Sequence, residues 1–509
     1  MSDAKPAKLG LAGALTRAFI SSPLTPLFII AALAVGLVAL ISLPREEEPQ
    51  ISVPLVDIHI SAPGLKAPDA VKLVTEPMET IVKGINGVEH VYSQTADDGA
   101  MVTVRFVVGT PADAAILRVH DKVRANLDRI PVGIPEPLIV GRGIDDVAIV
   151  SMTLSPKPSH PEITANDLTR IARELRAEVA KIEDVGLSYL VGEVPEAIRI
   201  NPDPDRLALY GVTLQQLAAK VQSANKSYNT GSLRSDGKMV DLVVGETLTS
   251  PDQIAALLVT TRDDRPVYVS DVADVEFVAE ADSQIVSNIS KQGDVVARTP
   301  AVTLAVAKRA GANAVVVAEA VLHAVEQAEG RIIPDTIAIE VTRDYGETAN
   351  EKANELLFHL GLATVSIIGL VFLAVGWRES IVVAIVIPVT ILLTLFAAWI
   401  MGYTLNRVSL FALIFSIGIL VDDAIVVIEN IARHWGMGGT RPRKQAAIDA
   451  VAEVGNPTIV ATLTVVAALL PMLFVSGLMG PYMSPIPSNA SAAMMDAAKP
   501  PFISQVPRP

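Results

Sequence analysis

Five long apolar stretches constrain this chain more strongly than any other feature of its sequence. Each is close to or above the length of about 20 residues that a helix needs to cross a bilayer. Half of all residues are hydrophobic and only 19% are charged, which is typical of a membrane protein that also has large water-facing parts. We expect membrane-spanning helices at residues 27–43, 356–375, 381–402, 408–431 and 459–479.

Basic residues beside these stretches predict the orientation of the chain, because loops rich in Lys and Arg stay in the cytoplasm. With a cytoplasmic N-terminus, all of them fall on that side: Lys5, Lys8, Arg17, Arg378, Arg433, Arg441, Arg443 and Lys444. The sequence after Pro44 is charged and does not look like a signal-peptide cleavage site, so the first stretch is expected to stay as an anchor. Residues 1–44 are expected to hold the N-terminus and first span, and residues 355–479 the other four spans.

The first two spans are separated by about 310 residues, which this orientation places outside the cytoplasm. Short strand-like runs alternate there with amphipathic helical runs, in the order of two split βαβ units, βαββαβ or ferredoxin-like. We expect the first unit at 45–145 and the second at 146–224 and 275–350, interrupted by an inserted, mainly β subdomain at 225–274. The predicted fold class is a membrane α-helical bundle plus α+β external subdomains. With a net charge of −14 and no basic stripe, nucleic acid is not an expected partner.

The fourth apolar stretch contains two adjacent acids, Asp422 and Asp423. An Asp near the centre of a membrane helix costs about 2.5–3.5 kcal/mol, and such residues mark paths for ions or protons. The helix therefore needs partner helices around its acidic face. The alternative is a buried helix of a soluble protein with a paired or capping acid, which the four other apolar stretches argue against.

Three motifs carry a resemblance to a known family. Residues 418–430 read GILVDDAIVVIEN, residues 44–49 read PREEEP after the first span, and residues 480–483 read GPYM after the fifth. With these motifs in order, residues 1 to about 493 resemble the N-terminal half of the permease subunit of resistance-nodulation-division efflux pumps of the multidrug or solvent type.

This resemblance implies a multi-pass antiporter of the cell inner membrane that exports small molecules, with a large periplasmic domain. It implies a homotrimer that works with a periplasmic adaptor protein and an outer-membrane channel, and that uses no cofactor because the proton gradient drives it. The external units would be porter subdomains, and the insertion a docking subdomain. The resemblance assigns the proton relay to Asp422 and Asp423.

Two further residues of the same motif, Glu429 and Asn430, are possible members of the proton pathway. Glu429 has a second interpretation, a carboxylate that reaches the cytoplasmic interface, and the same caution holds for Asn430. His359 in the second span has two interpretations, a packing histidine or a proton relay, and the first is preferred.

The last residues depart from the family pattern. Residues 480–509 contain Asp496, Lys499 and several prolines where the family continues into a sixth span, so we expect an aberrant or truncated tail and no further span. The chain alone is then expected to be an inactive N-terminal half. The alternatives are a half-subunit that needs a separate second half, a protein-export factor, or a non-transporting membrane-anchored assembly or binding fragment. No nucleophile or phosphate-binding motif predicts an enzyme.

Overall fold

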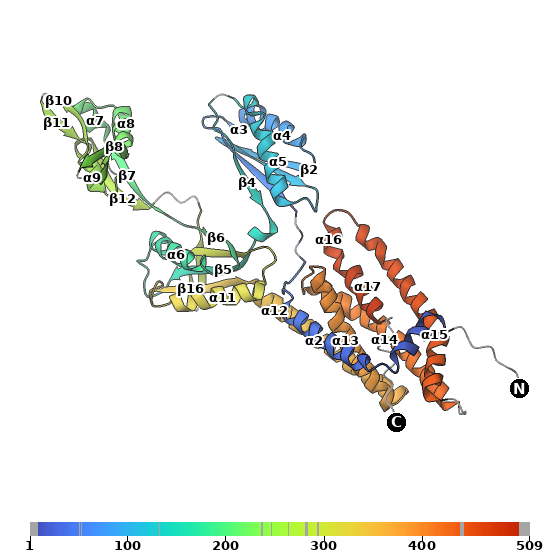
Figure 1. Ribbon diagram of the computed structural model, residues 1–509. Coiled ribbons are helices and arrows are strands. Elements are labelled where there is room, and N and C mark those ends of the chain that lie inside the picture. The colour runs from blue at the N-terminus through green and yellow to red at the C-terminus, as the bar shows by residue number, and fades with distance from the viewer. Residues whose placement is uncertain are drawn as a thin grey trace.

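The computed structural model describes residues 9–49, 51, 53–131, 133–235, 238–245, 247–262, 264–279, 284–292, 295–437 and 442–497. Figure 1 shows a bundle of long helices at one end, with three α/β parts extending from it. Three of the basic residues used above to predict orientation lie outside the described residues: Lys5, Lys8 and Arg441.

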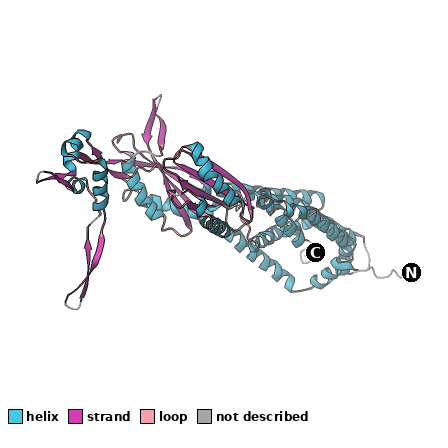
Figure 2. Cartoon of the chain, turned by 90° about the horizontal axis from the view of Figure 1, so that it is seen from above, coloured by secondary structure: helices cyan, strands magenta, loops and turns pink. Residues whose placement is uncertain are grey.

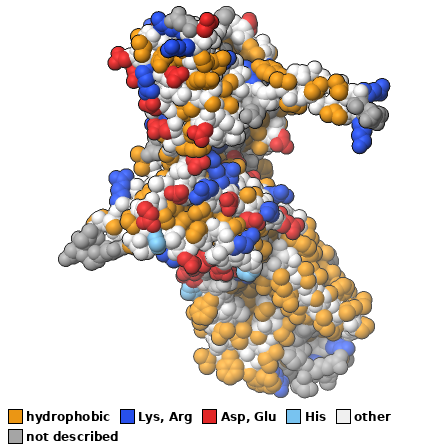
Figure 3. Space-filling model, turned by 90° about the vertical axis from the view of Figure 1, so that its left-hand side faces the viewer, with side chains coloured by type: hydrophobic (Ala, Val, Ile, Leu, Met, Phe, Trp, Pro, Cys, Tyr) orange, Lys and Arg blue, Asp and Glu red, His pale blue; other side chains and the backbone are white. Residues whose placement is uncertain are grey.

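The described residues include five helices that are long and apolar enough to cross a membrane. They are α2 (Leu24–Ser42), α12 (Tyr345–Ala374), α13 (Trp377–Ile400), α14 (Arg407–Gly436) and α15 (Arg443–Leu469), the last continued by the 3₁₀ turn η4 (Leu470–Phe474). The predicted helical membrane bundle is confirmed. Figure 3 shows this part of the molecule covered almost continuously by hydrophobic side chains.

The bundle is built on close contact between its apolar helices. A Cβ atom at Gly36 of α2 would lie 2.7 Å from the carbonyl oxygen of Leu392 on α13, so a glycine is required for this approach. The shared core includes Val383 and Ile387 of α13 and Ile417 of α14. Pro388 lies inside α13, where it lacks the backbone N–H that would bond to the preceding turn. Membrane helices tolerate such a proline because neighbouring helices satisfy the freed backbone groups.

Two shorter helices pack on the bundle. Near the N-terminus, α1 (Gly10–Phe19) places Ala12 in a core with Val427 of α14 and Val451 of α15. After the short helix α16 (Met479–Met483), α17 (Pro485–Ala497) lies against α13, α14 and α15. With 13 residues, α17 is shorter than a span, but Ala490 and Met494 are buried against Val466. The described part of the expected tail is thus a packed helix.

The first α/β unit is a four-stranded antiparallel sheet covered by helices. Its strands follow the order β2-β3-β1-β4, with the chain order β1, helices, β2, β3, α5, β4. On β3, alternate residues Val102, Val104 and Phe106 are buried, because successive side chains of a strand point to opposite faces. The elements are β1 (Leu55–Ser61), α3 (Ala67–Ala70), the π turn η1 (Val71–Thr75), α4 (Glu76–Lys83), β2 (Val88–Ala96), β3 (Gly99–Phe106), α5 (Ala112–Arg124), η2 (Leu127–Arg129) and β4 (Leu138–Arg142).

The second α/β unit repeats this topology, with strand order β16-β5-β15-β6. Its core joins Met152, Leu168, Leu304 and Val321 from the sheet and both helices. The predicted pair of βαββαβ units is therefore present in the structure. The elements are η3 (Ile144–Asp146), β5 (Ala148–Pro156), α6 (Ala165–Val179), β6 (Val185–Val191), a hairpin of β13 (Ser287–Gln292) and β14 (Val295–Pro300), β15 (Val302–Lys308), α11 (Ala314–Ala328) and β16 (Ile337–Asp344).

The inserted subdomain begins earlier than the sequence analysis places it. A two-stranded ribbon of β7 (Glu196–Pro202) and β12 (Ala273–Ala279) leads into it, and helix α8 (Leu214–Ala224) packs in its core through Leu217, beside Ile254 and Val269. The periodicity of α8 shows that one of its faces is buried but not in which unit. The other elements are α7 (Pro204–Tyr210), β8 (Tyr228–Ser235), β9 (Lys238–Val244), α9 (Pro251–Ala255), β10 (Leu258–Arg262), β11 (Arg265–Tyr268) and α10 (Val269–Val272).

The strands β8 and β9 form a hairpin that Figure 2 shows extending far from the subdomain. Apolar side chains along it are exposed, among them Leu233, Val240 and Leu242. An isolated two-stranded hairpin is marginally stable in water, so this arm is expected to find a partner.

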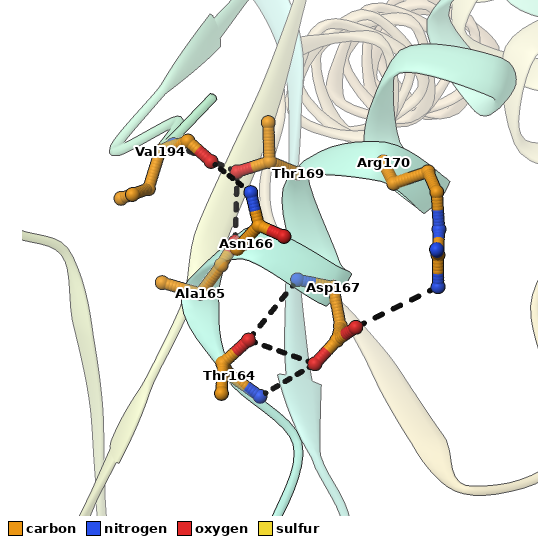
Figure 4. A network of polar contacts seen from close by, with 7 residues as sticks. All are labelled: Thr164, Ala165, Asn166, Asp167, Thr169, Arg170 and Val194. Atoms are coloured by element: carbon orange, nitrogen blue, oxygen red, sulfur yellow. Dashed lines mark hydrogen bonds and ion pairs between the residues drawn. The ribbon is translucent and has the colours of Figure 1, made fainter. Parts of the chain in front are cut away.

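The first turn of α6 is fixed by a capping box (Figure 4). The Thr164 hydroxyl oxygen accepts from the Asp167 backbone N–H, and the Asp167 carboxylate accepts from the Thr164 N–H at 3.1 Å and from its hydroxyl at 2.7 Å. Next to it, Asn166 and Thr169 exchange hydrogen bonds with the backbone of Val194, at 2.9 and 2.8 Å, and so hold the helix end to the segment after β6.

These hydrogen bonds, first that from the Thr164 side chain and then that from its backbone, lower the pKa of Asp167 below its ordinary value of 3.8. A lowered pKa in the folded state stabilises the fold above the ordinary pKa, and this stabilisation is lost as the pH falls through the lowered value. We expect Thr164→Ala to cost about 1 kcal/mol of local stability. Hydrogen exchange of the α6 amides checks this, and Asp167→Asn is expected to remove the acid dependence. Equal exchange in the wild type and in Thr164→Ala contradicts the prediction.

Candidate functional site

The two membrane aspartates lie on α14, a helix of 30 residues whose start is well defined. The side chain of Asn406 caps it by accepting from the backbone N–H of Ser409 at 2.9 Å. Because consecutive helical residues point about 100° apart, Asp422 and Asp423 face different surroundings. Asp423 is half-buried and turned towards α15, whereas Asp422 is exposed.

Asp423 is tied to the neighbouring helix by a single hydroxyl. The Thr462 hydroxyl of α15, a residue only 3% exposed, donates to Asp423 Oδ2 at 2.8 Å. The same hydroxyl lies 2.9 Å from the backbone oxygen of Thr458. A hydroxyl carries one proton, so it donates to one of these two acceptors at a time.

This choice of acceptor depends on the charge of Asp423. An ionised carboxylate only accepts hydrogen bonds and makes a stronger one than a backbone carbonyl. A protonated carboxyl can donate to the Thr462 oxygen, which frees the hydroxyl proton for Thr458. The contact between α14 and α15 therefore differs between the two protonation states of Asp423.

Asp422 lies on a stripe of α14 that the described residues leave uncovered. The stripe follows helical spacing and consists of Phe411, Phe415, Gly418, Asp422, Val426 and Glu429, all of them exposed. A Cβ atom built at Gly418 would meet nothing within 4 Å. Acidic side chains within membranes almost always face the interior of a bundle or a water-filled cavity, which makes this stripe a candidate contact surface for further helices.

Asn430 and Glu429, the two possible pathway residues, have different surroundings. Asn430 is 6% exposed, and its side-chain amide donates to the backbone oxygen of Ala450 at 2.9 Å and approaches Glu453 at 3.4 Å. Glu453 also pairs with Arg433 at 2.9 Å and His434 at 2.8 Å, so Asn430 belongs to a polar cluster that joins α14 to α15. Glu429 is exposed on the stripe and has no hydrogen bond or ion pair within the described part of the chain.

His359 is not brought to the aspartates by the fold. Its ring lies on α12 with 55% of the side chain exposed, 4.0 Å from Glu355 on the same helix. Among the described residues, no group of three or more His, Cys, Asp and Glu side chains is placed to hold a metal ion.

The sequence analysis did not identify Thr462 or Glu453. A hydroxyl within an apolar run is the signal that would have drawn attention to Thr462, but such residues often bond only to their own helix. Glu453 lies before the predicted fifth span, in a part of α15 that the hydropathy pattern does not include.

In a comparison with known families, residues 15–498 match the model described as the AcrB/AcrD/AcrF family, which is a family of resistance-nodulation-division transporters. The match covers the membrane helices, both α/β units, the inserted subdomain and α17. The family resemblance that the three sequence motifs predict is confirmed.

The different surroundings of the two neighbouring residues Asn430 and Glu429 give a matched test. We expect Asn430→Ala to destabilise the packing of α14 on α15 by at least about 0.6 kcal/mol, the average for a hydrogen bond between membrane helices, because it removes a buried amide with two contacts. Glu429→Gln is expected to change stability by less than about 0.5 kcal/mol. Unfolding in detergent measures both, and a larger loss for Glu429→Gln than for Asn430→Ala contradicts these assignments.

Proposed function

This chain belongs to the AcrB/AcrD/AcrF family, and we propose that it forms the proton-driven permease part of a system that exports small molecules across the inner membrane. The observation that carries the proposal is the bond between Asp423 and Thr462, with Asp422 adjacent, inside an apolar membrane helix. Such a site binds and releases protons and changes a contact between two helices when it does so.

The proton gradient supplies the energy for this cycle. Each charge that moves through 100 mV contributes about 2.3 kcal/mol, enough to shift an equilibrium between two conformations. Protonation from the outside removes the charge of the aspartates and lets the Thr462 hydroxyl bond to its own helix. Release of the proton to the cytoplasm restores the hydrogen bond from Thr462 to Asp423 and returns α14 to its first position. No cofactor is needed for such a cycle.

The uncovered stripe of α14 supports a further part of the proposal. We propose that other membrane helices cover Asp422 and Glu429 in the working transporter, because an acid that faces lipid is costly. Gly418 lets a partner helix approach closely, as small residues do at contacts between membrane helices. These helices belong either to the same polypeptide or to a separately encoded half. Co-expression of the chain with candidate second halves tests whether the covering helices come from a separately encoded half.

The external units support the assembly that the family resemblance implies. We propose that the exposed β8–β9 arm of each copy contacts the neighbouring copy in an oligomer. The family resemblance implies that this oligomer is a homotrimer. The inserted subdomain lies far from the membrane helices in Figure 1. We propose that it contacts a periplasmic adaptor protein and an outer-membrane channel, the partners that the family resemblance implies.

We expect Asp422→Asn and Asp423→Asn each to reduce proton-driven export to background, because neither amide can take up and release a proton. The measurement is the efflux of a fluorescent dye from cells without their own pumps. These cells produce the chain alone or together with the second half of a full-length family member. Asp113→Asn, at an exposed acid in the first turn of α5 outside the membrane helices, is the control and is expected to retain export.

If the wild-type chain exports the dye in either arm, and both Asn variants export it equally well, the proposed proton site is contradicted. No export in the single-chain arm together with export in the co-expression arm supports a half-subunit. Binding of the adaptor without export in both arms supports an assembly fragment in place of a transporter.

The β8–β9 arm gives a test of self-association. Leu233 and Val240 are paired across the hairpin and are both more than half exposed. We expect Leu233→Asp with Val240→Asp to convert the oligomer into monomers, because the charged pair cannot be buried against a second copy without a counter-charge. Light scattering in detergent measures the mass. Asp241→Asn, on the same arm, is expected to leave it unchanged, and an unaltered mass for the double variant contradicts the role of the arm.

A further inference from the structure

A short segment after α2, residues 43–48, connects three parts of the molecule; we call it the strap. Its backbone pairs with the residue before the cap of α14: the Leu405 N–H donates to the Pro44 oxygen at 2.9 Å, and the Glu46 N–H donates to the Leu405 oxygen at 3.1 Å. The Arg407 N–H donates to the Glu47 oxygen at 3.3 Å. The start of α14 is thus bound to the strap by three backbone hydrogen bonds.

Side chains of the strap extend these contacts. Arg45 donates to Asn350 at 2.6 Å and to Asn354 at 3.2 Å, both on α12. Glu48 pairs with Arg407 in the first turn of α14. The strap therefore contacts the outer ends of both α12 and α14.

The remaining acid of the strap reaches into the second α/β unit. Glu46 Oε1 lies 3.0 Å from Nζ of Lys308, the last residue of β15, and the two side chains are only 5% and 3% exposed. Strand β15 is an inner strand of its sheet, so a force on Lys308 acts on the sheet as a whole.

This buried ion pair is not expected to add much to the stability of the fold. Two charges lose their hydration, and an apolar pair of the same size holds two segments together as well or better. The Lys308 ammonium and Glu46 Oε2 also lack a well-aligned hydrogen bond within the described residues. What a buried ion pair does supply is a fixed position, because each charge is strongly held only beside its partner.

The pair borders a cavity of about 460 Å³. Other charged and titratable groups line this cavity: Glu47, Glu48, Asp145, Arg343, Tyr345 and Tyr482. Of these, Glu48 is paired with Arg407, and the Arg343 guanidinium lies over the ring of Tyr345 at 3.7 Å.

The second unit is thus attached to the membrane helices at two points. One is the start of α12, which follows β16 directly at Tyr345 and packs against α11 and β5 of the unit. The other is the Glu46–Lys308 pair, which leads through the strap to α14. When two attachment points lie on different helices, a shift of α14 along α12 turns the unit about its attachment at the start of α12.

We infer that Glu46 and Lys308 are positioning residues that transmit movement of α14, the helix with the aspartates, to the second α/β unit. This inference rests on the proposed proton site for the source of the movement. The contacts form one continuous path from α14 to β15, as a physical route of coupling requires.

The chain contains no cysteine, so it accepts a pair of spin labels without other changes. The labels are attached at Val316→Cys on α11 and Met401→Cys after α13, both exposed positions. In the full chain in lipid nanodiscs, we expect the distance between the labels to differ between pH 5 and pH 8. The neutral double variant Glu46→Gln with Lys308→Met is expected to lose this difference.

Three further variants make the result specific. The charge-reversed variant Glu46→Lys with Lys308→Glu is expected to restore at least half of the pH-dependent shift, which a merely structural role does not predict. Asp422→Asn with Asp423→Asn is expected to abolish the shift although the strap is intact. As a matched control, the exposed pair Arg124 and Glu136, also 3.0 Å apart, is neutralised by Arg124→Met with Glu136→Gln, and the shift is expected to remain.

A full shift in the neutral Glu46 and Lys308 variant overturns the inference, as does a wild-type distance that does not respond to pH. A shift that persists without the aspartates but disappears without the ion pair overturns the proton site as its source and assigns the pH response to the cavity. The dye-efflux assay tests the export function separately from all these outcomes.

Discussion

The cost of placing carboxylates in hydrocarbon is the constraint on which the rest of this structure depends. The two aspartates together cost about 5–7 kcal/mol, whereas each surrounding Leu, Ile, Val or Phe returns only about 0.3–0.6 kcal/mol. Helix α14 is therefore stable in a membrane only with neighbours that supply polar contacts. Thr462 is one such contact, and the open stripe at Asp422 and Gly418 is where others are required.

This constraint also explains why α14 is polar at both ends. At its start, Asn406 and Arg407 bond to their own helix and to the strap, and at its other end Asn430 and Arg433 join the cluster around Glu453. The apolar centre is held mainly by packing. A switchable contact at Asp423 allows the helix to have two positions, and its bonded ends carry the change to the strap and to the Glu453 cluster. A packed core favours discrete states over gradual deformation.

Much of the fold was predictable from the sequence, because hydropathy and periodicity are local. The five spans occur where the hydropathy pattern places them, and two βαββαβ units are present, but helix α8, expected in the second unit, belongs to the insertion. The ends of elements were less predictable: α12 begins at Tyr345 and α15 at Arg443, since their polar first turns lie outside the apolar stretches. The site was predicted in part. The motif predicts a proton site at Asp422 and Asp423, which stays a proposal. The partner of Asp423 and the inward direction of Asn430 depend on how α14 and α15 are rotated against each other, and no single-helix pattern contains that information.

The relation between the aspartates and the strap follows from the geometry of one helix. Asp423 contacts α15 in the middle of α14, and the strap holds the start of α14 beside α12. A change in the central contact that moved only side chains would be absorbed locally, because rotamers adjust at little cost. A helix, however, keeps its rise of 1.5 Å per residue, so an axial shift at the aspartates reaches Leu405 undiminished. There the backbone hydrogen bonds make the strap follow the shift, and the Glu46–Lys308 pair is the next contact along the path to the second α/β unit.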